Sequence, residues 1–200
     1  KDKLLKSAVI CGANASGKTN VIFGMNYLRH IVLTSHKLQI GEMLDCMPFK
    51  LDKNRLSEPS KFEIVFIKDN IRYKYGVSLT NSKIIDEYLY YWPNSRRALI
   101  FSRKNTKEYD FASLDVNEQT LNSQRTPENV LYLSRTTQFN YSKTKTVFDW
   151  FNNNLQTIGP TDHPRLEQIT ADLVKKSDYK KMIIRGLNEA DFGIDNITTK

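Results

Sequence analysis

The stretch from Gly12 to Thr19 constrains this chain more than any other. It reads Gly-Ala-Asn-Ala-Ser-Gly-Lys-Thr and directly follows the apolar run Ala8–Cys11. The pattern Gly-x-x-x-x-Gly-Lys-Thr, between a buried strand and an amphipathic helix, is typical of a phosphate-binding P-loop. Glycines at its two ends allow the backbone to wrap closely, with peptide N–H groups pointing inward at anionic oxygens. The sequence therefore predicts a nucleotide-binding loop between the first strand and the first helix.

The residue types within this loop match the chemistry of a triphosphate. Lys18 is expected to reach the β- and γ-phosphates and so to act in catalysis, and the Thr19 hydroxyl is expected to ligate Mg²⁺. The helix that begins near Gly17 adds the positive end of its dipole. The predicted nucleotide-binding residues are Gly12, Ala13, Asn14, Ala15, Ser16, Gly17, Lys18, Thr19 and Asn20.

Length and composition indicate a globular protein without a membrane partner. The chain has 200 residues, of which 40% are hydrophobic and 26% charged, enough for one good-sized domain or two small ones. No apolar run approaches the roughly 20 residues that cross a bilayer, and no signal peptide is visible. The first residue is Lys1 rather than Met, as expected of a fragment. A cytoplasmic location fits these features best.

The two cysteines and three histidines suggest neither a disulfide framework nor a metal centre. Cys11 lies in the apolar run before the loop, where a small buried thiol is expected. The histidines show no ligand spacing, and no Ser-His-Asp or Cys-His arrangement indicates nucleophilic catalysis.

A formal net charge of +8 is compatible with a nucleic-acid or other polyanionic partner. The basic residues occur as scattered pairs, which usually form a solvated face. No interleaving of basic and aromatic residues indicates a surface that reads bases, so sequence-specific recognition is not expected.

Hydrophobic periodicity divides the chain into a P-loop unit, an antiparallel β region and a helical region. The first helix is expected over residues 17–35, with its apolar stripe packed on a sheet. Strands are expected at 62–66, 71–79, 84–92 and 98–103, and the polar segment 104–124 is expected to be a loop with one short strand. Helices are expected at 126–138, from 142 to the Gly159-Pro160 stop, at 164–176 and at 179–189. A turn into a strand is expected over 191–197.

Thr126-Pro127-Glu128 supplies the start signal for the helix predicted at 126–138, because it combines a capping hydroxyl, a first-turn proline and an acidic residue. The order of elements favours an α/β fold of the P-loop NTPase class. Its expected form is the N-terminal lobe of an ABC-ATPase head, with an antiparallel β meander and a following helical region. The predicted domains are residues 1–125 for the P-loop unit and β lobe, 126–190 for a helical subdomain, and 191–200 for the start of a second lobe.

Four separated stretches resemble the prokaryotic AAA-family, ABC-like ATPases of the abortive-infection and OLD-like group, which are related to SMC and RecF heads. They are Ile10–Asn20, Phe62–Phe66 with Tyr73–Val77, Glu87–Tyr91, and Ala190–Asp195. The resemblance implies a cytoplasmic ATPase that uses ATP with Mg²⁺ and forms a homodimer or higher oligomer. It also implies antiphage defence beside a nuclease or toxin effector. Within the loop, Asn14 and Ser16 are typical of this group, as is Asn20 after it.

Three further segments partly match catalytic motifs of ABC heads. Ile84-Ile85-Asp86-Glu87 superficially resembles a Walker B segment, but it lies within the predicted meander rather than at the end of a buried parallel strand. Leu133-Ser134 begins like an ABC signature but continues without a glycine. Gln138 matches the glutamine that links the metal to the helical region in ABC heads, although an exposed polar residue at a helix end is the simpler interpretation.

Three functions remain open on the sequence. In the first, the chain is part of a dimeric ATPase that controls an effector, with Walker B and signature residues beyond Lys200 and little activity in this segment alone. In the second, it is a RecF- or SMC-like head in DNA repair, whose positive charge contacts DNA. In the third, it is a nucleotide-gated scaffold that binds ATP with little turnover.

Overall fold

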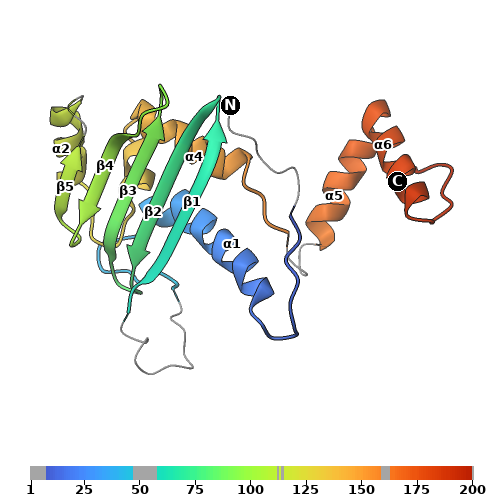
Figure 1. Ribbon diagram of the computed structural model, residues 1–200, viewed down its shortest axis with the longest axis horizontal. Coiled ribbons are helices and arrows are strands. Elements are labelled where there is room, and N and C mark those ends of the chain that lie inside the picture. The colour runs from blue at the N-terminus through green and yellow to red at the C-terminus, as the bar shows by residue number, and fades with distance from the viewer. Residues whose placement is uncertain (1–7, 47–57, 112, 114, 159–162, 200) are drawn as a thin grey trace. The chain divides into compact units, whose positions relative to one another are not determined.

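The computed structural model describes residues 8–46, 58–111, 113, 115–158 and 163–199 (Figure 1). The chain divides into two compact units, residues 1–157 and 158–200. The three-part division expected from the sequence, at residues 125 and 190, stays a prediction.

A five-stranded antiparallel sheet organises the first unit, with its strands in the spatial order β1-β2-β3-β4-β5. This meander is the one expected from the alternating apolar residues. A two-residue turn at Asp69 and Asn70 joins the two strands of the first hairpin. Both residues have positive φ (51° and 60°), as a tight hairpin turn requires. The strands are β1 (Ser60–Lys68), β2 (Ile71–Leu79), β3 (Ile84–Trp92), β4 (Ala98–Lys104) and β5 (Glu108–Phe111).

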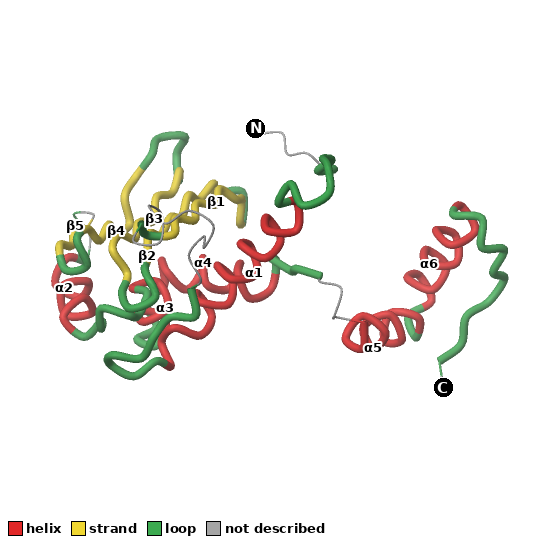
Figure 2. Tube along the Cα trace, turned by 90° about the horizontal axis from the view of Figure 1, so that it is seen from below, coloured by secondary structure: helices red, strands yellow, loops and turns green. Residues whose placement is uncertain are grey.

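Helices cover one face of this sheet, as the end-on view shows (Figure 2). Helix α1 (Lys18–Thr34), the 3-10 turn η1 (Ser35–Lys37), α3 (Tyr132–Thr137) and α4 (Ser142–Asn153) form this layer, and α2 (Val116–Gln124) lies beside β5. Phe66 packs on Trp150 of α4, with ring centroids 3.9 Å apart, and makes an edge contact with Phe151. The core therefore lies between the inner face of the sheet and these helices.

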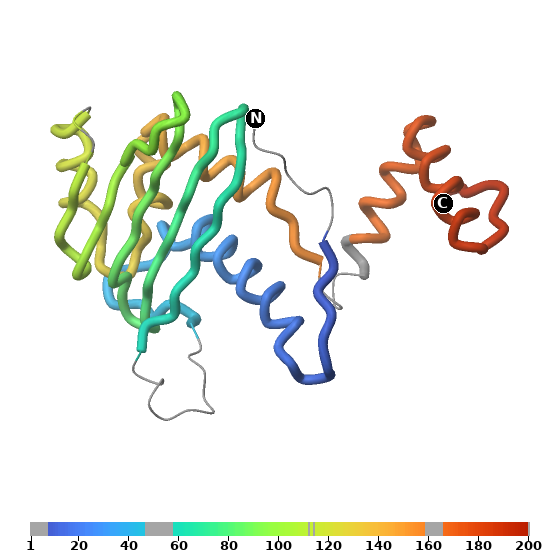
Figure 3. Tube along the Cα trace, viewed as in Figure 1, coloured from blue at the N-terminus to red at the C-terminus, as the bar shows by residue number. Residues whose placement is uncertain are grey.

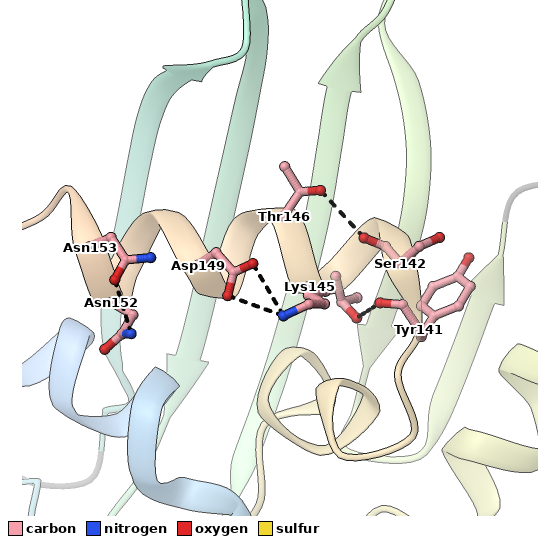
Figure 4. A network of polar contacts seen from close by, with 8 residues as sticks. Tyr141, Ser142, Lys145, Thr146, Asp149, Asn152 and Asn153 are labelled. Atoms are coloured by element: carbon pink, nitrogen blue, oxygen red, sulfur yellow. Dashed lines mark hydrogen bonds and ion pairs between the residues drawn. The ribbon is translucent and has the colours of Figure 1, made fainter.

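Helix α4 shows why one helix face is apolar and the other polar. Val147 and Phe151 are buried against the sheet. On the opposite side Lys145 pairs with Asp149 at 3.3 Å, one turn along the exposed surface (Figure 4). Thr146 lies at the border of the buried face, and its hydroxyl donates to the Ser142 carbonyl. Exposed pairs of this kind contribute only a few tenths of a kcal/mol each. The buried stripe is what holds α4 in place.

Buried polar residues connect the sheet to the helical layer. Glu87 of β3 is fully buried, and its carboxylate accepts hydrogen bonds from the backbone N–H groups of Tyr132 (2.7 Å) and Leu133 (2.9 Å). These are the first amides of α3, so a sheet residue caps that helix from outside its own segment. Arg103, opposite Glu87 on β4, donates to the carbonyls of Thr106 and Val130.

The helix predicted at 126–138 is wrong in its first half. Residues 126–131 form a turn, and α3 begins only at Tyr132. The Glu128 carbonyl accepts a hydrogen bond from the Ile84 amide and another from the Arg103 guanidinium. The Pro127 carbonyl also accepts from Arg103. These tertiary bonds use the carbonyls that a continuous helix would have required.

Two expectations for the polar segment 104–124 had different outcomes. The short strand is confirmed as β5, but the remainder of the segment contains a helix, α2, that periodicity did not indicate. The side chains that α2 buries are polar, Gln119 and Asn122, so it has no apolar stripe to detect.

Two predicted strands do not form among the described residues. Ala8–Cys11 pairs with none of the described strands, and its side chains point to solvent, with Val9 87% and Ile10 58% exposed. Cys11 is exposed rather than buried, which corrects the expectation for its thiol. Residues 192–199 are likewise without strand pairing. A strand is stable only beside a neighbour, and the meander does not extend to either segment.

The second unit contains α5 (His163–Val174) and α6 (Ser177–Glu189), which contact each other. Both helices were predicted. Val174 is buried, whereas α6 buries no side chain fully. Within the described residues, no helix combines the length and apolarity needed to cross a bilayer.

Candidate nucleotide-binding loop

The predicted P-loop has the backbone of a helix-initiating turn. Gly17 is the residue before α1 and has a left-handed conformation, with φ 88° and ψ 11°. Glycine adopts that conformation without the steric cost that a Cβ imposes. No side chain caps the start of α1, and its first turn holds no acidic residue. The first amides of α1 and the positive end of its dipole are therefore available to an anion.

The other small residues of the loop allow its tight course. A Cβ on Gly12 would lie 2.9 Å from the Ser16 hydroxyl oxygen, too close for an unmoved side chain. Ala15 also has positive φ, at 60°. The Ser16 amide donates to the Ala13 carbonyl at 3.3 Å, closing a turn. A curved backbone with positive-φ residues of this kind points successive N–H groups to one side, as an anion-binding nest does.

Lys18 lies across this turn. Its ammonium group donates to the carbonyls of Gly12 (2.8 Å) and Ala13 (2.6 Å). The structure thus brings the beginning of the predicted loop, Gly12 and Ala13, into contact with the ammonium group of Lys18 near its end. A phosphate group that enters the loop would compete with these two carbonyls for the ammonium.

The loop is open to solvent on its outer side. Residues 11–16 are exposed, as are Thr19 and Asn20, whereas Gly17 and Lys18 are half-buried. The N-terminal half of α1 is exposed as well, and Figure 3 shows this part of the chain running beyond the edge of the sheet. Of the predicted apolar stripe, Leu28 and Val32 are buried, but Val21, Ile22 and Met25 are not. The expectation that the whole stripe packs on the sheet therefore holds only for the second half of α1.

Magnesium has a single expected protein ligand here, Thr19, in the first turn of α1. Among the described residues no group of three or more histidines, cysteines and acidic residues could hold a metal ion. The chemistry fits a P-loop, where most of the Mg²⁺ shell comes from phosphate oxygens and water. Thr19 would hold the ion, and the ion would neutralise charge between phosphates.

The segment that resembles a Walker B motif has a structural role instead. The Glu87 oxygens are engaged by Tyr75 and by the first amides of α3. Burial raises the pKa of Glu87, although Arg103 and these hydrogen bonds oppose the shift. Burial also raises the pKa of Tyr75 well above its usual range. A carboxylate enclosed in this way is not placed to polarise water at the P-loop.

The structure also places the other two candidate residues, Ser134 of the signature-like segment and Gln138. Ser134 is fully buried, and its hydroxyl oxygen lies 3.0 Å from His36 Nδ1 and accepts from the His36 amide. Partial burial lowers the pKa of His36, and the nearby charges of Lys37 and Arg135 lower it further. Gln138 is exposed directly after α3, as the simpler interpretation expected.

This loop, with its αL glycine and its lysine at the start of a helix, defines the chain as a P-loop protein. A family model described as "AAA domain, putative AbiEii toxin, Type IV TA system" matches residues 7–199. The chain belongs to that family, and its AAA domain indicates an ATPase. No curated protein and no solved structure matched the chain.

Proposed function

We propose that this chain is the ATP-binding part of an ABC-type ATPase that couples ATP binding and hydrolysis to the control of a protein effector. The observation that carries the proposal is the loop at the start of α1, where Lys18 and the free helix N-terminus converge. Gly12 to Asn20 would bind the phosphates, with Lys18 on the β- and γ-phosphates and Thr19 on Mg²⁺. The family description, which mentions a toxin and a toxin–antitoxin system, supports a nuclease or toxin as the effector.

The proposal includes a homodimer or higher oligomer, in the cytoplasm, in antiphage defence of the abortive-infection kind. Hydrolysis requires an acid that positions water and a group that binds the γ-phosphate from the far side. We assign both to parts of the complete assembly outside the described residues. The exposed apolar side chains of Val9, Ile10 and Phe23, near the loop, support a covered surface there in the working complex.

The experiment is ATP turnover by the complete protein, with and without duplex DNA, beside its Lys18→Ala variant. The matched control is Lys37→Ala, which removes an exposed lysine from the other end of the α1 region. We expect turnover to depend on Lys18, to ignore duplex DNA and to be unchanged in the control. Equal turnover in Lys18→Ala would contradict the proposal. DNA-stimulated turnover would favour a RecF- or SMC-like head, and ATP binding without turnover would favour a gated scaffold.

A further inference from the structure

The face of the sheet opposite the helices carries a row of aromatic side chains. On β3 the residues alternate, so Glu87, Leu89 and Tyr91 point to the core while Tyr88, Tyr90 and Trp92 point outward. Strand register sets cationic residues of β2 opposite this row, pairing Arg72 with Trp92 and Lys74 with Tyr90. We call the outward-pointing side chains of β3 and their cationic neighbours the outer aromatic face. It consists of Tyr88, Tyr90, Trp92, Arg72, Lys74 and Arg97.

Two guanidinium groups stack on this row. The Arg72 guanidinium carbon lies 4.2 Å from the centroid of the Trp92 ring, and that of Arg97 lies 4.9 Å from the Tyr90 ring. Such pairs combine a flat π surface with a positive charge. Each pair therefore offers stacking area and attraction for an anion in the same place.

Tyr88 is held flat by its neighbours. A Cβ on Gly76, its partner on β2, would lie 2.2 Å from the Tyr88 ring, so the ring occupies the space that glycine leaves open. The Tyr88 hydroxyl donates to Glu63, which also pairs with Lys74 at 2.8 Å. The ring therefore lies against the sheet with one of its faces turned away from the backbone.

A hollow of about 610 Å³ opens where the row meets the hairpin turns. Arg72 and Trp92 line it, together with the polar side chains of Asn70, Asn94 and Ser95. This volume accommodates a nucleobase, and amides and a hydroxyl at its rim can hydrogen-bond the edge of a base.

Charge at this end of the sheet is strongly positive. The cations are Lys68, Arg72, Lys74, Arg96 and Arg97. The same two hairpins hold four acids, of which Glu87 is buried on the core side and Asp86 lies toward the other end of β3, opposite Ser78. The remaining two, Glu63 and Asp69, pair with Lys74 and Lys68 respectively. The net positive charge at this end, to which the exposed Arg96 and Arg97 contribute, favours a polyanionic occupant over a neutral or basic protein surface.

We propose that the outer aromatic face binds single-stranded nucleic acid, with bases stacked on Tyr88 and on the guanidinium-covered rings of Tyr90 and Trp92, and phosphates held by the charges of the same arginines. An aromatic row on an open sheet can stack only on bases whose faces are unstacked. A duplex hides those faces, so it gains only the phosphate contacts. Stacking on a π surface accepts any base, which means that little sequence preference follows. The activity is separate from the ATP site at the P-loop.

The test is fluorescence anisotropy with a labelled oligothymidine of about 12 nucleotides, a length within the range of known single-strand sites. Its duplex with oligoadenine is the comparison, at about 50 and about 200 mM salt. We expect the single strand to bind at least about tenfold more tightly than the duplex. Trp92→Ala should weaken single-strand binding by about tenfold, the loss of one base stack. Circular dichroism and urea unfolding establish that each variant folds.

Arg97→Glu is the second variant, because Arg97 is exposed in the β3–β4 connection and its replacement leaves the core intact. It should weaken binding and reduce the dependence on salt. The matched control is Lys83→Glu, the same charge reversal in the exposed turn at the opposite end of the sheet, which should bind as the original chain does. Lys18→Ala should also bind as the original chain does, which separates this proposal from the ATPase.

Equal affinity for single strand and duplex would overturn the proposal, as would unchanged binding in folded Trp92→Ala and Arg97→Glu variants. A folded protein that binds no oligonucleotide would also overturn it, and would favour a protein partner for this face instead.

Discussion

The Tyr75 hydroxyl donates a hydrogen bond of 3.0 Å to the Glu87 carboxylate, between neighbouring strands and entirely out of contact with solvent. The same carboxylate accepts from the first two amides of α3. One side chain therefore connects β2, β3 and helix α3, which begins 45 residues after Glu87 in the chain. The segment Asp86-Glu87, which resembles a catalytic motif in sequence, is a structural junction in this fold.

Glu87→Ala should destabilise the protein by about 3–5 kcal/mol. The change leaves the Tyr75 hydroxyl and two amides of α3 without their acceptor and removes the acidic group that interacts electrostatically with the buried Arg103. Glu87→Gln keeps an acceptor and should cost less, about 1–3 kcal/mol. Urea unfolding followed by tryptophan fluorescence measures both. A loss below about 0.5 kcal/mol in Glu87→Ala, the size of a surface effect, would contradict this role.

Gly76→Ala should destabilise the sheet by about 1 kcal/mol, because its methyl group displaces the Tyr88 ring and breaks the hydrogen bond to Glu63. In a Tyr88→Ala background the same substitution meets no ring. It should then be neutral or slightly stabilising, since alanine loses less backbone entropy than glycine. A double-mutant cycle in urea measures the difference. An equal cost in both backgrounds would show that the ring is not what excludes a side chain.

Stability should fall as pH drops below about 6.5 because of His36. Its pKa is lowered in the folded protein by burial and by Lys37 and Arg135, so the unfolded chain binds the proton more readily. The stabilisation is present above the ordinary histidine pKa of 6.5 and is lost as pH falls through the folded-state pKa. His36→Gln should show a smaller decline between pH 7 and pH 5. Unfolding curves across this range test it, and parallel declines would contradict the assignment.

Gly17→Ala should weaken ATP binding by about tenfold or more. The left-handed conformation at Gly17 costs an alanine about 1–2 kcal/mol, and relaxation of that strain moves the first amides of α1. The matched control is Gly186→Ala, in an exposed turn of α6 with open space around the new methyl group. That change should leave ATP binding unchanged and stabilise α6 by up to about 1 kcal/mol. Isothermal titration with ATP and Mg²⁺ distinguishes the two, and equal affinity in Gly17→Ala would contradict the loop assignment.

Local patterns determined much of this protein. Two-residue alternation located β2 and β3 to the residue, and 3.6-residue periodicity located α1, α5 and α6 to within a few residues, because these elements each present one apolar face. The start of α4 at Ser142 is confirmed, but α4 ends at Asn153 and not at the expected Gly159-Pro160 stop. The P-loop could be predicted from the sequence for a different reason. A glycine, a lysine and a hydroxyl at fixed spacing are required by phosphate geometry whatever the rest of the fold is. The roles of Lys18 and Thr19 stay predictions that only ligand binding can test.

Tertiary structure decided the remainder. The segment Ala8–Cys11 has the composition of a buried strand, yet a strand needs a neighbour, and none of the described strands provides one. Thr126-Pro127-Glu128 has a helix start signal, but tertiary hydrogen bonds from Ile84 and Arg103 use its carbonyls. The sequence shows that Tyr88, Tyr90 and Trp92 alternate along one predicted strand and so share one of its faces. Only the register of β2 against β3 sets arginine and lysine beside them, because residues distant along the chain become neighbours through strand pairing.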